Sequence, residues 1–486
     1  MSKRNTYPRA RSIPTRAKLR GPLAAAIVAL LLAGCTSFVP DYQRPAAPVA
    51  SAFPFDTAGT ASAVAAADID WQQFFQDARL RQLISLALRN NRDLRVAILN
   101  IEQARAQLQV KRSDELPTVN VGATGSRQPN SSGGITSAYT AGFNVTGYEL
   151  DFFGRVRALS QAAQAQLLGT EEARKTVQIA LVASVANTYL SLLADDDLLR
   201  VTRDTLTTRE DSLRLTKLKL DQGVSSELDF RQAESLLQGA RVALAQLTRQ
   251  RALDDNALTL LLGQTLAPDA AAALPAGLAL TGQGLLGELP AGVPSELLAR
   301  RPDVRQAEQQ LLAANANIGA ARAAFFPRIT LTSSLGTASS ELSGLFKSGS
   351  FGWTFAPQLI LPIFDAGRNQ ANLDASKVGR DIATAQYEKA IQGAFREVAD
   401  ALALRATLGE QLRSQLAQTN ALETTLRLTD LRYRNGAASY FEVLDAQRSV
   451  FAARQAVVQL QLQQTQNQVG LYKVLGGGWK EAPTAQ

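Results

Sequence analysis

The sequence predicts a mixed α and β protein built from two similar halves, each supplying two amphipathic strands and two long helices. Three observations support this fold class. Residues 214–263 recur without a gap at 427–476, with Gly223, Arg241 and Leu247 among the positions retained. Segments of alternating polar and apolar residues precede each copy, and leucine-rich segments without proline lead into both. An internal repeat of this kind is typical of an elongated assembly.

The chain begins with a segment typical of a secretory signal peptide. Seven basic residues precede an apolar run, 21–34, that is too short to span a bilayer as a helix. We expect residues 1–34 to be removed as a signal peptide. The remaining chain then has 44 basic and 43 acidic residues, so the net charge of +8 gives no support for a nucleic-acid partner.

Cys35 is the only cysteine, and it ends the sequence LAGC. This sequence resembles the bacterial lipobox, whose cysteine is acylated and becomes the mature N-terminus. We therefore expect lipid attachment at Cys35 and an extended, lipid-anchored segment over 35–78. Thr36 follows the cysteine, where an aspartate would retain a lipoprotein at the inner membrane, so the outer membrane is the expected destination. The alternative is a signal peptide that contains a cysteine by chance.

Alternating residues predict four strands, near 117–126, 139–149, 327–336 and 352–363. Each has one apolar and one polar face. If the strands lie in a membrane, the candidate lipid-facing side chains are those of Val119, Val121, Phe143, Val145, Ile329, Leu331, Trp353 and Phe355.

Uninterrupted segments predict very long helices. No proline occurs from Gly154 to Leu220, and apolar residues recur every seven positions from Val185 onwards. Gly223 suits the left-handed position that ends a helix, and a second helix is expected over 227–262. The repeat predicts the same helical hairpin in the second half.

The predicted elements divide the mature chain into two repeats, 79–263 and 296–476. Each contains a helix, a β-hairpin and a long helical hairpin. Residues 264–295, rich in alanine, glycine and proline, are expected to form an irregular insertion, and 477–486 a C-terminal tail.

No other apolar run approaches the length of a membrane-spanning helix, so any membrane-spanning elements are expected to be strands. Strands in lipid must close into a barrel, because every backbone hydrogen-bonding group has to be paired. Four strands are fewer than the eight of the smallest barrels. Two copies would give a barrel filled by its own side chains, whereas three copies would give twelve strands and room for a pore.

Three long motifs resemble the outer membrane factor family, also called outer membrane efflux proteins. They are DWQQFFQDARLRQLISLAL, ARRPDVRQAEQQLLAANANIGAARAAFFPRITL and RYRNGAASYFEVLDAQRSVF. With the lipobox, they are most similar to the NodT/OprM-type lipoproteins, which are TolC-like. The resemblance implies a homotrimer with a twelve-stranded β-barrel in outer-membrane lipid and a periplasmic α-helical barrel. It also implies a passive efflux channel that works with a periplasmic adaptor and an inner-membrane pump of the RND type.

The resemblance further implies a gate at the periplasmic ends of the helical hairpins. LDAQR at 444–448 matches the family motif whose aspartate forms a negatively charged constriction, with Phe441 as an apolar plug and Arg434 nearby. Gln232 stands at the position of Asp445 in the first half. The alternative is that Asp445 pairs with Arg448 or Arg434 on a solvated surface. The expected adaptor-contacting residues are Gly223, Val224, Ser225, Gly436, Ala437 and Ala438.

The composition argues against an enzyme. The chain has no histidine, and its single cysteine is the expected lipid site, which excludes the usual nucleophile–base pairs and zinc sites. We expect no cofactor and no metal. A type I protein-secretion channel would share the whole architecture and remains an alternative. A periplasmic coiled-coil lipoprotein scaffold is a second alternative, although it should lack paired amphipathic strands.

Overall fold

The computed structural model describes residues 37–55, 66–131, 133–266, 272–285 and 300–479, together with Asp269 and Leu289. The predicted signal peptide and Cys35 lie outside the described residues. The chain forms two compact units. Among the described residues, the strand unit comprises 37–41, 110–162 and 315–377, and the helical unit comprises the others.

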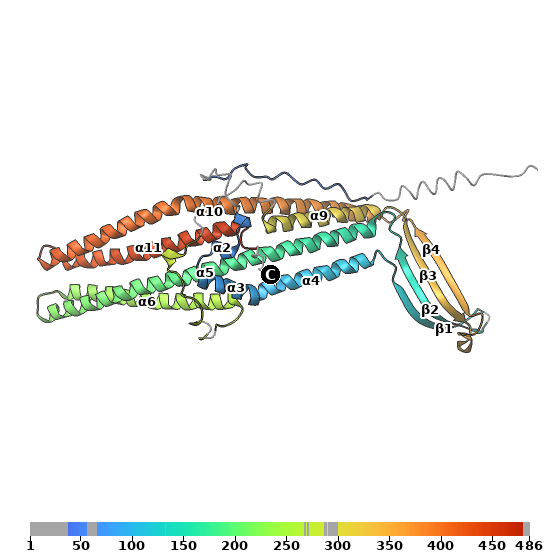
Figure 1. The fold of residues 1–486 in the computed structure, drawn as a ribbon, viewed down its shortest axis with the longest axis horizontal. Coiled ribbons are helices and arrows are strands. Elements are labelled where there is room, and N and C mark those ends of the chain that lie inside the picture. The colour runs from blue at the N-terminus through green and yellow to red at the C-terminus, as the bar shows by residue number, and fades with distance from the viewer. Residues whose placement is uncertain are drawn as a thin grey trace, which may run out of the picture. The chain divides into compact units, whose positions relative to one another are not determined.

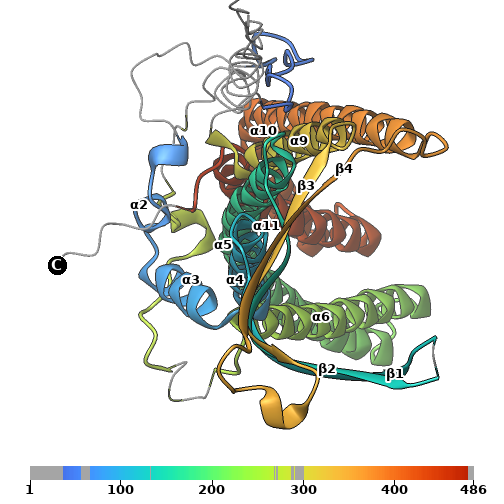
Figure 2. The same cartoon turned by 90° about the vertical axis from the view of Figure 1, so that its right-hand side faces the viewer.

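The strand unit contains one antiparallel sheet in the order β1-β2-β3-β4 (Figures 1 and 2). Its strands are β1 Val119–Pro129, β2 Ile135–Glu149, β3 Arg328–Ser339 and β4 Phe351–Ile360. The four predicted strands are therefore confirmed. β4 ends before the predicted 363 because Pro362, which has no backbone N–H, follows closely.

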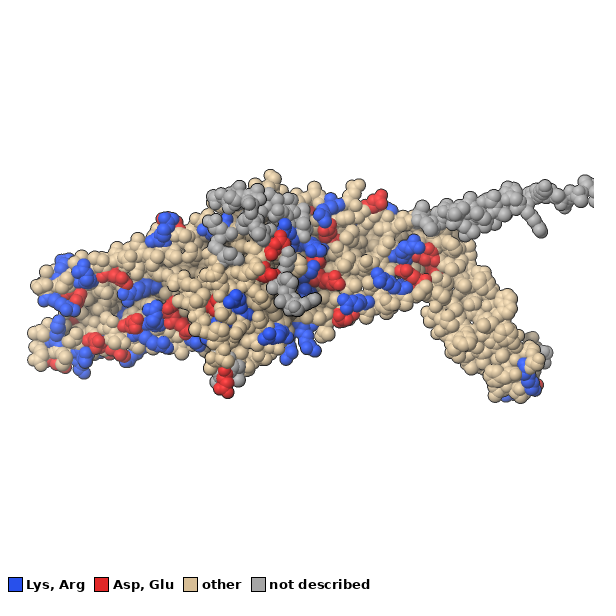
Figure 3. Space-filling view, viewed as in Figure 1, with Lys and Arg blue, Asp and Glu red and all other residues tan. Residues whose placement is uncertain are grey.

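The sheet has one apolar and one polar face. Val121 pairs with Phe143, Phe143 with Leu335, and Leu335 with Trp353, so these side chains form one row on the same face. All four are exposed in the single chain. Few charged residues cover the strands on the face seen in Figure 3, except at the end of the sheet.

The opposite face carries hydroxyl pairs between neighbouring strands. The hydroxyl oxygens of Thr124 and Thr140 lie 2.6 Å apart, and those of Ser334 and Thr354 lie 2.7 Å apart. The sheet therefore separates an apolar surface from a hydrogen-bonding one, as expected of a barrel wall between lipid and water.

A row of glycines crosses all four strands. Gly122 pairs with Gly142, Gly142 with Gly336, and Gly336 with Gly352. A Cβ atom added to Gly142 would overlap the carbonyl oxygen of Leu335 and lie 2.6 Å from the Cα atom of Gly336. The two central strands thus approach so closely at this level that they leave no space for side chains.

The helical unit is dominated by two hairpins. The first consists of α5 Arg155–Asp221 and α6 Glu227–Leu262, and the second of α10 Arg368–Arg434 and α11 Tyr440–Val474 (Figure 1). The predicted helical hairpin and its repetition are confirmed. The other described helices are α2 Trp71–Phe74, α3 Ala78–Asn90, α4 Arg92–Ser113, α9 Pro302–Ala323 and the short η1 Ala66–Asp68 and η2 Leu280–Gly282, while the short η3 Leu342–Gly344 belongs to the strand unit.

One expectation about apolar runs was wrong. Helix α5 contains an 18-residue window with a mean hydropathy of 1.6, long and apolar enough to span a membrane by these criteria. However, 61% of that window is buried inside the protein. The run is apolar because α5 forms part of the core of the helical unit.

The N-cap residue of helix α3 is buried in the core of the helical unit. Asp77 precedes α3, is 1% exposed, and accepts hydrogen bonds from the backbone N–H groups of Arg79 and Leu80 at 2.8 and 3.2 Å. It also accepts from the hydroxyl of Tyr189 at 3.1 Å and from the N–H of Leu278 at 2.9 Å. One carboxylate therefore joins α3, α5 and the insertion that follows α6.

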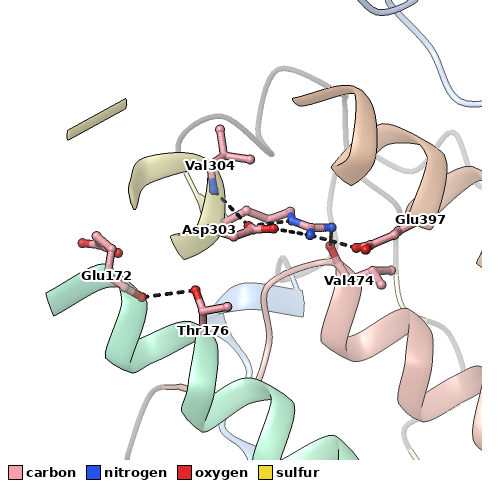
Figure 4. A network of polar contacts seen from close by, with 7 residues as sticks. Glu172, Thr176, Asp303, Val304, Glu397 and Val474 are labelled. Carbon is pink, nitrogen blue, oxygen red and sulfur yellow. Dashed lines mark hydrogen bonds and ion pairs between the residues drawn. The ribbon is translucent and has the colours of Figure 1, made fainter. Parts of the chain in front are cut away.

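A second polar network joins three helices of the same unit. The guanidinium of Arg301 contacts the carboxylates of Asp303 and Glu397 at 2.6 and 2.8 Å and donates to the carbonyl of Val474 at 3.0 Å (Figure 4). Because the Arg301 side chain is only 9% exposed, these partners compensate for its burial. The network holds the start of α9 against α10 and the end of α11.

The extended N-terminal segment is bound to α9 by charged groups. Arg44 donates two hydrogen bonds to the carboxylate of Glu308, at 2.7 and 2.9 Å, and the Tyr42 hydroxyl donates a third at 2.9 Å. Such a bidentate pair fixes orientation as well as position.

Candidate functional site at the hairpin ends

The two hairpin turns have the same backbone structure, 213 residues apart. Gly223 and Gly436 have φ angles of +72° and +73°, which L-residues with side chains rarely adopt. The N–H of Val224 donates to the carbonyl of Lys219 at 2.9 Å, and that of Ala437 donates to Arg432 at 2.8 Å. This is the helix-ending motif that a left-handed glycine permits, and it confirms the conformation expected for Gly223.

Each returning helix also begins in the same way. Ser226 caps α6 and exchanges hydrogen bonds with Asp229, while Ser439 caps α11 and exchanges them with Glu442. The backbone hydrogen bond from Ser439 lowers the pKa of Glu442, because it favours the ionised carboxylate. Each turn therefore lies between a helix-ending glycine and a helix-starting serine cap. Val224, in the first turn, is 73% exposed.

A polar contact joins the two hairpins near these turns. The Lys219 ammonium on α5 donates to the Tyr433 hydroxyl on α10 at 3.0 Å and lies 4.7 Å from the centre of that ring. Tyr433 in turn packs against Tyr440 at the start of α11, with the ring centres 5.2 Å apart. Lys219 thus links the two hairpins near their ends.

Asp445 lies on α11 with its side chain 55% exposed, and its nearest cationic partner is Arg448 at 3.5 Å. Arg434 instead pairs with Asp430 at 2.7 Å. Of the two arginines considered as partners of Asp445, only Arg448 therefore contacts it in this chain. Phe441, 54% exposed, precedes Asp445 on the same helix.

Lys219 and Tyr433 were not recognised in the sequence. They lie more than 200 residues apart, and although Tyr433 falls within the motif RYRNGAASYFEVLDAQRSVF, that motif does not point to Lys219, because their contact depends on how the two hairpins pack. Among the residues that the structure describes, no group of three or more acidic, cysteine or histidine side chains could hold a metal ion.

A four-stranded sheet with one apolar and one polar face, combined with two long helical hairpins, defines a subunit of a TolC-like outer-membrane channel. The family model described as outer membrane efflux protein matches residues 83–264 and 293–477. The chain therefore belongs to the outer membrane efflux protein family. It is an outer-membrane channel of an efflux system and extends into the periplasm.

The chain is similar to several efflux proteins over almost its whole length. It is 48% identical to the antibiotic efflux pump outer membrane protein ArpC and to the toluene efflux pump outer membrane protein TtgC, both from Pseudomonas putida. Each alignment covers 94% of this chain and 96% of the relative. The structure of the open state of the MtrE outer membrane channel of Neisseria gonorrhoeae matches with a TM-score of 0.84 and 42% identity, covering 92% of this chain and 99% of that chain.

Proposed function

We propose that three copies of this chain form a passive exit duct for small organic molecules delivered by an inner-membrane pump through a periplasmic adaptor. The observation that carries this proposal is the two-faced, four-stranded sheet, in which β1 and β4 are the edge strands within the described residues. Pairing β4 of one copy with β1 of the next would close twelve strands and leave no edge. The apolar row containing Phe143 and Trp353 would then face lipid, and the hydroxyl pairs would face the lumen.

The class of cargo is proposed from the relatives. Proteins 48% identical to this chain are named for antibiotic and toluene efflux. We expect a comparable range of small, largely apolar compounds and a pump of the RND type. The duct itself needs no energy source, because the pump performs the active step.

The gate is proposed to lie at the hairpin ends. Three copies of Asp445 around one axis would attract cations and repel one another, and each Arg448 would screen part of that charge. The adaptor is proposed to contact the two turns, where the exposed Val224 offers an apolar contact and the rigid caps preserve its position. The lipid anchor at Cys35 belongs to the same proposal and rests on the LAGC sequence.

Susceptibility and assembly assays test this function together. Deleting the gene should increase accumulation of toluene-like solvents or antibiotics, and expression of the intact chain should restore efflux. Crosslinking in cells should recover an adaptor and a pump with the channel, and the purified particle should have the mass of a trimer. Unchanged accumulation together with the loss of a secreted protein would instead support the type I secretion channel.

A further inference from the structure

A buried arginine that forms no ion pair within the described residues lies between the two helical hairpins. Arg209 on α5 is 4% exposed. Its Nη1 atom donates to the backbone carbonyl of Leu236 on α6 at 2.7 Å, and its guanidinium carbon lies 5.0 Å from the centre of the Phe451 ring on α11. Its Nε atom is buried and has no hydrogen-bond partner in the described part of the chain.

The charges around Arg209 do not neutralise it. No carboxylate within the described residues forms an ion pair with Arg209, and the cation whose charge acts on it is Arg448. Burial first, and then Arg448, lowers the pKa of the Arg209 guanidinium. Arg454, a neighbouring arginine on α11, is already paired with Glu423 at 2.7 Å. A buried cation without an opposite charge is unfavourable, and neutral carbonyl or aromatic contacts offset only part of that cost.

The unpaired group borders a small cavity. The cavity has a volume of about 110 Å³, and Arg209 lines it together with Gln447, Phe451, Thr208 and Asp204. The Gln447 Oε1 atom is also buried without a partner. Because the two ends of an amide can be exchanged by rotation, Gln447 can present its NH2 group to the cavity. Arg209 and Gln447, each with one buried polar atom that lacks a partner among the described residues, therefore border the same partly open cavity.

The internal repeat indicates that a helical hairpin of this kind does not require an arginine at this position. The residue 213 positions after Arg209 is Leu422, and the residue 213 positions before Phe451 is Gln238. The neighbouring ion pair, by contrast, occurs in both halves, as Arg241–Glu210 and Arg454–Glu423. The contact between Arg209 and Phe451 therefore has no counterpart at the equivalent positions of the repeat. It occurs where the first hairpin meets the second.

We propose that this cavity binds one small monovalent anion, of the carboxylate or halide class, held by Arg209 Nε and the Gln447 amide. A water molecule could accept the hydrogen bond, but only an anion also neutralises the charge. The bound anion would link α5 to α11 and so fasten the first hairpin to the second near their periplasmic ends. This inference does not depend on which molecules pass through the channel.

Thermal stability in different salts tests the site in the intact, purified protein. At constant ionic strength, replacing gluconate, a bulky carboxylate, with formate should raise the unfolding midpoint saturably, by about 1–2 °C at ten times the dissociation constant. Arg209→Leu places the residue of the second half at this position and should abolish the increase. Arg231→Leu is the matched control, because Arg231 is an exposed arginine of the same hairpin paired with Glu227 and Glu234. It should retain the formate effect.

Equal formate dependence in the Arg209→Leu and wild-type proteins would overturn the proposal. So would a wild-type protein that does not respond, since Arg209 would then have a carboxylate partner from another copy or no need of one. If Arg209→Leu fails to assemble, crystals of the wild-type protein grown in bromide give an independent answer. Anomalous density within hydrogen-bond distance of Arg209 Nε is expected, and its absence at saturating bromide would refute the site.

Discussion

Gly142 and Gly336 face each other across the β2–β3 pair, and neither position has space for a side chain. Gly352, in the same row on β4, has no atom within 4 Å of its would-be Cβ in the single chain. We expect Gly142→Ala to destabilise the channel by about 1–3 kcal/mol, because backbone atoms must move apart. Gly352→Ala should cost much less. The temperature at which the trimer dissociates in detergent measures both, and equal effects would contradict this account.

Charge on the apolar face of the sheet should be strongly unfavourable. Phe143→Lys should cost about 2–4 kcal/mol if this face meets the centre of the bilayer. The neighbouring Asn144→Lys is the control, because Asn144 points to the opposite face, next to Gly122. Reversible unfolding from lipid vesicles in denaturant would compare the two. A smaller cost for Phe143→Lys than for Asn144→Lys would reverse the assignment of the faces.

Removal of the Asp445 carboxylate should alter conduction without affecting assembly. Asp445→Asn is expected to reduce cation selectivity in planar bilayers, because three negative charges leave the proposed constriction and Arg448 loses its partner. Asp430→Asn removes an acid paired with Arg434 near the same turn and should change selectivity less. Identical single-channel properties in Asp445→Asn and the wild type would place the gate elsewhere.

Stability should depend on pH through the buried Asp195 carboxyl and its half-buried neighbour Asp254 in the first hairpin. Burial, followed by its hydrogen bond with Asp254, raises the pKa of Asp195 to about 7. The folded state therefore binds an additional proton, relative to an unfolded aspartate with a pKa of about 3.9. This contribution is complete below about pH 4 and is lost as the pH rises through 7, so stability should decrease across that interval.

The Asp195→Asn variant should lose this part of the pH dependence. Asp196→Asn, which removes the 2.6 Å pair with Arg251, should retain most of it, because burial and Asp254 contribute more than Asp196 to the raised pKa of Asp195. Midpoints of thermal unfolding between pH 4 and pH 8 would separate the variants. A wild-type stability that increases with pH over this interval, with the same slope in Asp195→Asn, would show that other groups control it.

Lipid attachment can be tested directly. The mature protein is expected to begin at an acylated Cys35, and mass spectrometry of its N-terminal peptide should show the added lipid. Cys35→Ser should abolish the modification, while the sheet still supplies an apolar surface for insertion. Retention of residues 1–34, or an unmodified Cys35, would disprove the lipid anchor.

Much of the fold could be predicted because its signals are local. Alternation within ten or so residues marked the strands, and a glycine suited to the left-handed helix end marked the first hairpin turn at Gly223, which the repeat extended to the second half. The wrong expectation concerned α5, whose apolar window is buried against neighbouring helices, because composition alone does not distinguish a buried helix from one in lipid.

The contacts between hairpins could not be predicted. Lys219 meets Tyr433, and Arg209 meets Phe451, only after the two halves have packed together. Tyr433 and Phe451 lie in the motif at 432–451, but that motif does not indicate what they contact, and a buried arginine has the same sequence signature as an exposed one. The motif around Asp445 was found by resemblance, but its local partner, Arg448 rather than Arg434, required the structure.

The matching turns at Gly223 and Gly436 have an evolutionary consequence. Because one gene encodes two copies of the same part, each copy can mutate while the other preserves the shape of the ring. A substitution in one half then appears three times around a channel with six similar hairpins. Asp445 opposite Gln232, and Arg209 opposite Leu422, are differences of this kind. A single-hairpin chain assembled six times would have to place every such charge at all six positions, so duplication allows the number of charges to change while the geometry of the ring is retained.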